Sequence, residues 1–206
     1  MNRNFNWIAC STVLLALPFS VFAAGDNSLS YNYLGAQAGY ADVDGNFGGD
    51  SDGPVLGVDG SAELVPNVNL VGSYSHSFLD NADLDMVSLG GGLHTDLNYD
   101  RNIRIDAFGT LTYEYINLDP DRGPNADDSG FGIRGGLRAK FENNLEANAS
   151  LGYVDYGSID GPVAEFGGLY SLPRNENVAL SLSYRYFDFD GAELDQLLAG
   201  IRFYIN

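Results

Sequence analysis

The sequence predicts an all-β fold, a ten-stranded antiparallel transmembrane β-barrel, with eight strands as the alternative count. Two observations lead to this prediction. Many short runs of the chain alternate apolar with polar residues, which is the period of a β-strand. The chain also holds 26 Gly and 13 Tyr against 2 Met and 1 Trp, a composition that favours short strands over helices.

The clearest run extends from Ile103 to Tyr115. One phase of it is apolar: Ile103, Ile105, Ala107, Gly109, Leu111, Tyr113 and Tyr115. The other phase is largely polar: Arg104, Asp106, Phe108, Thr110, Thr112 and Glu114. A membrane barrel turns its apolar phase to lipid and its polar phase to the lumen. The run exceeds the about 9–11 residues that a tilted strand needs to cross a bilayer, and its apolar phase ends in tyrosines, which favour the headgroup level.

Similar runs along the chain predict the ten strands. They span residues 31–43, 55–64, 68–78, 85–97, 103–115, 130–141, 145–153, 162–172, 178–186 and 195–206. The connections alternate between short turns and longer acidic, glycine-rich loops such as 42–53 and 118–129. Outer-membrane barrels have short periplasmic turns and longer extracellular loops, so the pattern favours a membrane barrel over a secreted β-sandwich.

Tyrosines gather near the loop ends of the predicted strands. They predict one aromatic girdle at the outer membrane interface: Tyr74, Tyr113, Tyr115, Tyr153, Tyr184 and Tyr186. A soluble sandwich has no physical reason to collect tyrosines at one level, whereas a bilayer interface does.

The N-terminus predicts export. Residues 1–24 form a signal peptide with Arg3, an apolar run and a small-residue cleavage site, which leaves residues 25–206 as one outer-membrane β-barrel domain. The only cysteine, Cys10, lies inside this segment, so no disulfide is expected in the mature chain. The net charge of −18 excludes nucleic acid as a partner, because a phosphate backbone attracts basic surfaces.

The polar phases carry charges of both signs, which predict a network inside the lumen. The set expected near the periplasmic end is Glu63, Asp96, Arg104, Asp106, Arg138, Lys140, Glu146 and Arg202. A second set is expected higher up: Asp59, Glu114, Arg134, Glu165 and Arg185. A salt-bridged plug is the favoured interpretation, because small barrels are filled by their own side chains, and a narrow polar path is the alternative.

Aspartates in the predicted loops are weak candidates for loose divalent-cation binding: Asp42, Asp44, Asp50, Asp52, Asp119 and Asp121. Oxygen-rich clusters suit Ca²⁺ or Mg²⁺. However, the run starting at Asp42 has its glycine at the wrong position for a calcium loop and no closing glutamate. We therefore predict a solvated acidic rim, with no defined metal site and no cofactor.

Catalysis is not expected. The two histidines are His76, on the outward phase, and His94, on the inward phase, and neither lies beside a nucleophile in the sequence pattern. The sequence SYNYLGAQAGY near the expected mature N-terminus, from Ser30 to Tyr40, and strands that end in G-x-Y or Y-x-Y resemble small proteobacterial outer-membrane barrels of the OmpA/OmpX-like kind. The acidic loops and strand spacing are most similar to the Ax twenty-one (activator of XA) family.

The resemblance implies a location in the outer membrane of a Gram-negative bacterium. The expected partners are outer-membrane lipid and lipopolysaccharide, together with the periplasmic chaperones and barrel-assembly machinery that serve such proteins. We expect a monomer with a structural or surface-interaction role in the envelope. The alternative function is a narrow porin-like channel for small solutes or ions.

Overall fold

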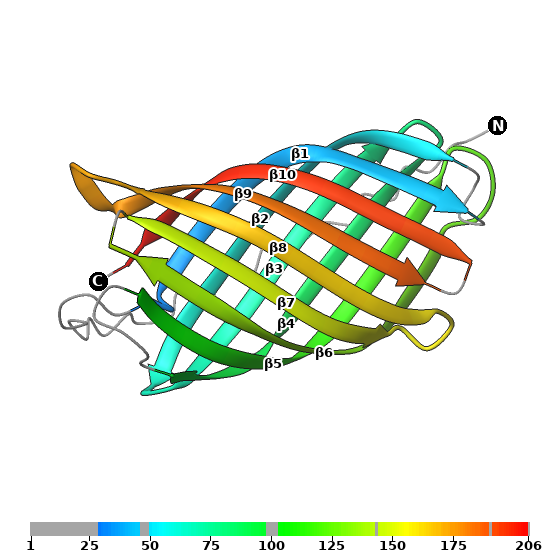
Figure 1. The fold of residues 1–206 in the computed structure, drawn as a ribbon. Coiled ribbons are helices and arrows are strands. Elements are labelled where there is room, and N and C mark those ends of the chain that lie inside the picture. The colour runs from blue at the N-terminus through cyan, green and yellow to red at the C-terminus, as the bar shows by residue number, and fades with distance from the viewer. Residues whose placement is uncertain (1–28, 46–49, 98–102, 143, 190, 206) are drawn as a thin grey trace, which may run out of the picture.

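The computed structural model describes residues 29–45, 50–97, 103–142, 144–189 and 191–205. This part of the chain forms ten strands (Figure 1). Their bounds are β1 Tyr33–Gly45, β2 Ser51–Val65, β3 Val68–Leu79, β4 Ala82–Asp96, β5 Ile103–Pro120, β6 Ala126–Phe141, β7 Leu145–Asp155, β8 Asp160–Leu172, β9 Asn175–Phe189 and β10 Ala192–Tyr204. In the described part of the chain, no helix is long and apolar enough to span a membrane.

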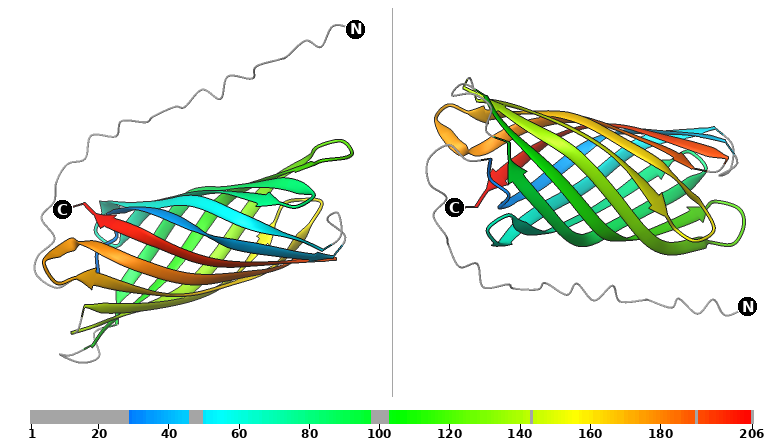
Figure 2. Two further views of the ribbon diagram at one scale, coloured as in Figure 1. Left: turned by 90° about the horizontal axis from the view of Figure 1, so that it is seen from above. Right: turned by 60° about the horizontal axis from the view of Figure 1, so that its bottom comes forward.

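The strands close into a single barrel. Each strand pairs antiparallel with its neighbours in the sequence, and β1 pairs with β10 from Tyr33 opposite Tyr204 to Gly45 opposite Ala192. The strands are inclined to the barrel axis in all views (Figures 1 and 2). The predicted fold class, an all-β barrel of ten antiparallel strands, is confirmed.

The two ends of the barrel differ in the connections they carry. β1 begins and β10 ends at one end, together with the β2–β3 and β6–β7 connections; we call it the turn end. Asn67 and Asn144 have positive φ angles in these connections, a conformation that asparagine tolerates better than most residues. The hairpins β1–β2, β3–β4, β5–β6, β7–β8 and β9–β10 close at the opposite end, which we call the loop end.

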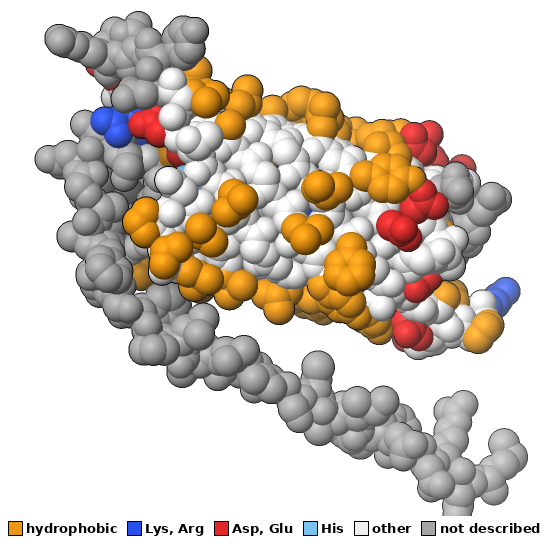
Figure 3. Space-filling view, turned by 90° about the horizontal axis from the view of Figure 1, so that it is seen from below, with side chains coloured by type: hydrophobic (Ala, Val, Ile, Leu, Met, Phe, Trp, Pro, Cys, Tyr) orange, Lys and Arg blue, Asp and Glu red, His pale blue; other side chains and the backbone are white. Residues whose placement is uncertain are grey.

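The apolar phases predicted to face lipid lie on the outside of the barrel. Leu111 and Ile133 are each 62 % exposed, and Leu151 is 66 % exposed. Apolar side chains are spread in patches along the surface in Figure 3, whereas most of the acidic side chains gather at one end of it. An exposed apolar belt of this kind is what lipid requires and what water opposes.

The strands extend further at the loop end than the sequence pattern predicted. β5 runs to Pro120, β6 begins at Ala126, and β2 begins at Ser51, so much of the acidic sequence assigned to long loops is strand. The predicted difference between long loops and short turns was therefore wrong. Aspartate and glycine are depleted in strands generally, but an outward position beyond the membrane is bathed in water and accepts aspartate.

Other boundaries also shift. The first strand begins at Tyr33 instead of Tyr31, and the last ends at Tyr204 instead of Asn206. The predicted signal peptide, residues 1–24, and the predicted turn over residues 98–102 lie outside the described residues.

Candidate functional site

Four arginine–carboxylate pairs line the lumen of the described barrel. Their shortest nitrogen–oxygen distances are 3.0 Å for Arg134–Glu114, 2.7 Å for Arg138–Glu146, 3.0 Å for Arg185–Glu165 and 3.3 Å for Arg202–Asp59. All these side chains come from the inward phases of their strands, as the alternation dictates. Buried charges are tolerated when they are paired and hydrogen-bonded, and in each of these pairs one side chain compensates the charge of the other.

The Arg134–Glu114 pair has further hydrogen-bond partners. Glu114, which is 2 % exposed, accepts hydrogen bonds from the hydroxyl groups of Ser88 (3.0 Å) and Thr112 (2.7 Å) besides its contact with Arg134. These neighbours satisfy a carboxylate that would otherwise be costly to bury.

The predicted lower network is brought together only in part. Arg138 is paired with Glu146, and Arg202 with Asp59 from the predicted upper set. The other members are placed by strand register: Asp106 opposite both Asp96 and Arg138, and Arg104 opposite Lys140, which in turn lies opposite Glu146. Glu63 lies 3.7 Å from the ring nitrogen of His94.

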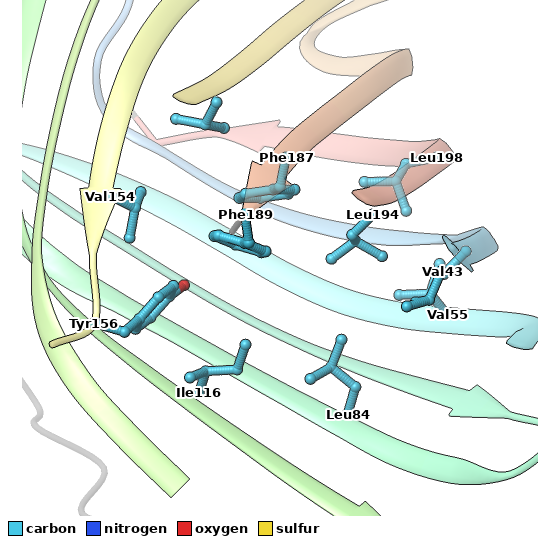
Figure 4. Packing of buried hydrophobic residues seen from close by; sticks show 12 residues of the cluster. Val43, Val55, Leu84, Ile116, Val154, Tyr156, Phe187, Phe189, Leu194 and Leu198 are labelled. Atoms are coloured by element: carbon cyan, nitrogen blue, oxygen red, sulfur yellow. The ribbon is translucent and has the colours of Figure 1, made fainter. Parts of the chain in front are cut away.

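A dry cluster closes the lumen at the loop end. Its side chains, which we call the apolar plug, are Ala41, Val43, Val55, Leu84, Ile116, Val154, Tyr156, Val163, Phe187, Phe189, Leu194 and Leu198 (Figure 4). The rings of Phe187 and Phe189 stack with their centroids 5.6 Å apart, and the ring centroids of Tyr156 and Phe189 are 5.8 Å apart in an edge-on arrangement. Each member is at most 7 % exposed, so these side chains are packed against one another at this end of the lumen.

Sequence reasoning missed the plug, although a signal was present. The runs ADVD at Ala41–Asp44, ADLD at Ala82–Asp85 and INLD at Ile116–Asp119 alternate apolar residues with acidic or amide residues. The apolar residues of these runs point inward, which is the reverse of the membrane-spanning part of the same strands.

A polar cavity of about 190 Å³ lies in the lumen below the plug. Serine and threonine hydroxyl groups form part of its wall: Ser61, Ser73, Ser88, Thr110, Thr112, Ser150, Ser181 and Ser183. A second cavity of about 80 Å³ shares Ser73 and Arg134 and reaches the plug at Phe187. The amide nitrogen of Gln196, a side chain that is 1 % exposed, has no hydrogen-bond partner in the described part of the chain, so it is available to a molecule in this cavity.

The six tyrosines of the predicted girdle all lie on outward phases near the loop end. Tyr40, which the prediction omitted, joins them with 53 % exposure. A repeated contact lies at this level: a tyrosine hydroxyl donates to an aspartate of the next strand in the same hairpin, in the pairs Tyr40–Asp52, Tyr74–Asp85, Tyr153–Asp160 and Tyr184–Asp195. The girdle is therefore the boundary between an apolar belt and an acidic surface (Figure 3).

We call the part of the barrel beyond the girdle the rim. The predicted cation ligands Asp42, Asp44, Asp52 and Asp119 are on strands of the rim, with Asp50 just before β2 and Asp121 just after β5. Asp42 lies opposite Asp52 on one side and Asp195 on the other. The charges of Asp42 and Asp50 raise the pKa of the Asp44 carboxyl. Among the described residues, no three acidic, histidine or cysteine side chains converge closely enough to hold a metal ion.

The two histidines are engaged in packing and hydrogen bonds. His94 stacks on Tyr31 inside the barrel at 3.7 Å. His76 lies outside, where its Nδ1 is 2.8 Å from Asp85 and its ring meets Phe78 edge-on. Neither contact includes a nucleophile of the kind that a triad requires.

Comparison with known proteins gives a family and a set of similar folds. The family model described as "Outer membrane protein beta-barrel domain" matches residues 11–186. Neisserial surface protein A is similar at 16 % identity, with a TM-score of 0.48, over 85 % of this chain and 98 % of that one. The N-terminal barrel of OprF from Pseudomonas aeruginosa is similar at 20 % identity, with a TM-score of 0.37, over 84 % of this chain and 98 % of that one.

A third similar solved structure is that of a protein of Yersinia pestis. Ail, the attachment invasion locus protein, is similar at 13 % identity, with a TM-score of 0.37, over 84 % of this chain and all of that one. No curated protein sequence matches the chain.

Proposed function

Because the chain belongs to the outer membrane protein β-barrel domain family, we propose that it is a closed barrel with a structural and surface-presenting role in the Gram-negative envelope. In this proposal the turn end, where β1 begins and β10 ends, faces the periplasm, and the rim stands on the cell surface. β5 continues seven positions beyond Tyr113 to Pro120, which lifts the rim roughly 15 Å above the girdle.

The apolar plug is the observation that carries this proposal. An ion or polar solute that crosses the lumen must enter a dry constriction of stacked aromatic and branched side chains, and such constrictions block conduction by excluding water. The four paired arginines reduce the free charge that a channel could use to attract ions. The porin-like alternative therefore requires the plug to move, and the proposal includes no catalytic step.

Several finer assignments belong to the same proposal. We assign the chain to the Ax twenty-one family on the strength of its acidic rim and strand spacing. Export follows from a cleaved signal peptide at residues 1–24, and assembly depends on periplasmic chaperones and the barrel-assembly machinery. Lipopolysaccharide surrounds the rim as lipid partner, and the barrel acts as a monomer without nucleic acid.

Planar bilayer recording tests the proposal. The wild-type protein should give no steady channels, whereas the double variant Phe187→Ser and Phe189→Ser should admit water to the plug and give measurable currents. Phe203→Ser is a matched control, because Phe203 is an aromatic residue on the outward phase, 45 % exposed, and should leave the barrel silent. Robust single-channel currents from the wild type would replace the structural function with the porin-like one.

A further inference from the structure

The segment Leu29–Asn32, which precedes β1, occupies the turn end of the lumen. Leu29 and Tyr31 are each only 6 % exposed, although they lie outside the strands. Tyr31 also lines the 190 Å³ cavity, so its side chain forms part of the periplasmic wall of that cavity. A terminal segment is normally mobile unless side chains hold it, and here they do.

Tyr31 is held between two side chains from the opposite wall of the barrel. Its ring stacks on His94 of β4, with centroids 3.7 Å apart and planes 11° apart. The guanidinium carbon of Arg138, on β6, lies 4.5 Å from the centroid of the same Tyr31 ring. Stacking and cation–π contacts of this geometry are favourable, and more so when they are shielded from water.

Arg138 also binds the backbone of the segment. Both terminal nitrogens of its guanidinium lie 3.3 Å from the carbonyl oxygen of Ser30, to which they donate, while the same group is paired with Glu146 of β7. Next to it, the carbonyl of Asn32 accepts from the backbone nitrogen of Ile205 at 2.9 Å. The segment thus connects the β1–β10 seam to β4, β6 and β7 across the lumen.

The cavity behind this segment suits small polar solutes. Hydroxyl groups form part of its wall, its arginines are paired with carboxylates, and the amide nitrogen of Gln37 in its wall has no hydrogen-bond partner among the described residues. Its volume of about 190 Å³ is enough for several water molecules or one small solute. On the opposite side the apolar plug separates it from the cell surface.

We propose that Leu29–Asn32 is a latch, and that its release admits small polar solutes to the cavity from the periplasmic end only. The barrel is then a one-sided chamber. Opening the latch exposes the hydroxyl-lined wall to the periplasm, while the plug keeps the outer membrane sealed. This goes beyond the structural function, which requires only that the barrel not conduct.

A cysteine inside the chamber tests the latch. Ser73, on the inward phase of β3, lines both cavities, so Ser73→Cys in a chain carrying Cys10→Ser places one thiol there. In detergent, a small charged methanethiosulfonate reagent should modify this thiol slowly. Adding Tyr31→Ala removes both ring contacts and should raise the rate by about tenfold or more.

Tyr31→Phe is the matched control. Phenylalanine removes only the hydroxyl and keeps both ring contacts, so this variant should label as slowly as the parent. Folding of each variant is checked by its heat-dependent gel mobility. If Tyr31→Ala does not fold, His94→Ala, which removes one face of the stack and leaves Arg138–Glu146 intact, should raise the rate by a smaller factor.

Two results would overturn the inference. Equal labelling rates in the parent and in the folded Tyr31→Ala or His94→Ala variants would mean that the segment does not control access. Steady currents from folded Tyr31→Ala in a planar bilayer would mean that the chamber is open at both ends. Currents from the wild type would instead defeat the proposed structural function, so the two failures are distinguishable.

Discussion

The membrane-spanning belt and the rim use the same strands with opposite patterns. On β5, Leu111 points out to lipid and Thr112 points in, whereas a few residues later Asn117 points out and Ile116 points in. The strand does not change its pleat at the girdle; the solvent outside it changes from lipid to water. Period two therefore fixes which residues share a face, but the surroundings decide whether that face is apolar.

The largest difference in stability between the rim and the membrane-spanning part should come from substitutions in the apolar plug. Phe187→Ala removes a large buried side chain from the rim, and the resulting cavity should lower the free energy of unfolding by about 3–5 kcal/mol. Ser181→Ala, on the inward phase of the same strand but in the polar cavity, should change it far less. Denaturant titration of the barrel folded into lipid vesicles measures both. Similar losses at the two positions would mean that the rim is not a packed core.

The outer faces should respond to arginine in opposite ways. Leu111→Arg places a charge against lipid and should cost about 2–4 kcal/mol of unfolding free energy if this position lies near the midplane. Asn117→Arg, on the outward phase of the same strand beyond the girdle, remains in water among acidic neighbours and should cost little. The same vesicle titration gives both values, and equal costs would remove the membrane boundary that we draw at the tyrosines.

The sequence predicted the belt well and the rim poorly. Runs such as Ile103–Tyr115 contain branched and aromatic residues that are common in strands, and their in/out phases are those of the structure. The rim runs contain Asp and Gly, which predict loops when they are considered locally. The one signal of strand structure in the rim sequences is the alternation of apolar and acidic residues in runs such as Ala41–Asp44 and Ala82–Asp85.

The ion pairs inside the lumen could not be predicted from the sequence either. That Arg138 and Glu146 face inward follows from period two, but their 2.7 Å contact depends on the register between β6 and β7. The docking of Tyr31 between His94 and Arg138 joins residues far apart in the chain, and nothing local in the sequence indicates it. Alternation specifies faces, whereas contacts across the lumen need the closed barrel.

Removing a tyrosine–aspartate hydrogen bond of the girdle should lower the unfolding free energy by less than the substitutions in the plug or in the lipid-facing belt. Tyr184→Phe removes the hydroxyl that donates to Asp195 while keeping the interfacial ring, and should cost about 0.5–1.5 kcal/mol. A double-mutant cycle with Asp195→Asn isolates the coupling between the two side chains. A coupling energy near zero would mean that the tyrosine acts through its position at the interface alone.

Two rim aspartates have pKa values that folding shifts in opposite directions. Asp42 and Asp50 raise the pKa of Asp44, whereas hydrogen bonds from the Ser158 hydroxyl and from the backbone nitrogens of Ser129 and Ser158 lower that of Asp128. A carboxyl whose pKa is raised by folding binds its proton more tightly in the folded state, so ionised Asp44 destabilises the barrel above its folded pKa. Ionised Asp128 stabilises the barrel above the unfolded value, and this contribution is lost as the pH falls through its folded pKa.

At about pH 7, Asp44→Asn should therefore raise the stability slightly and Asp128→Asn should lower it. As the pH falls, the two differences in unfolding free energy between variant and wild type should disappear at different pH values. The effect of Asp44→Asn should disappear once the pH is below the ordinary aspartate value of 3.8, and that of Asp128→Asn should persist to lower pH. Unfolding titrations of the two variants and the wild type across this range measure the differences. If Asp44→Asn were destabilising at neutral pH, the carboxylates of the rim would not be repelling one another, and a counter-charge bound among them would have to be sought.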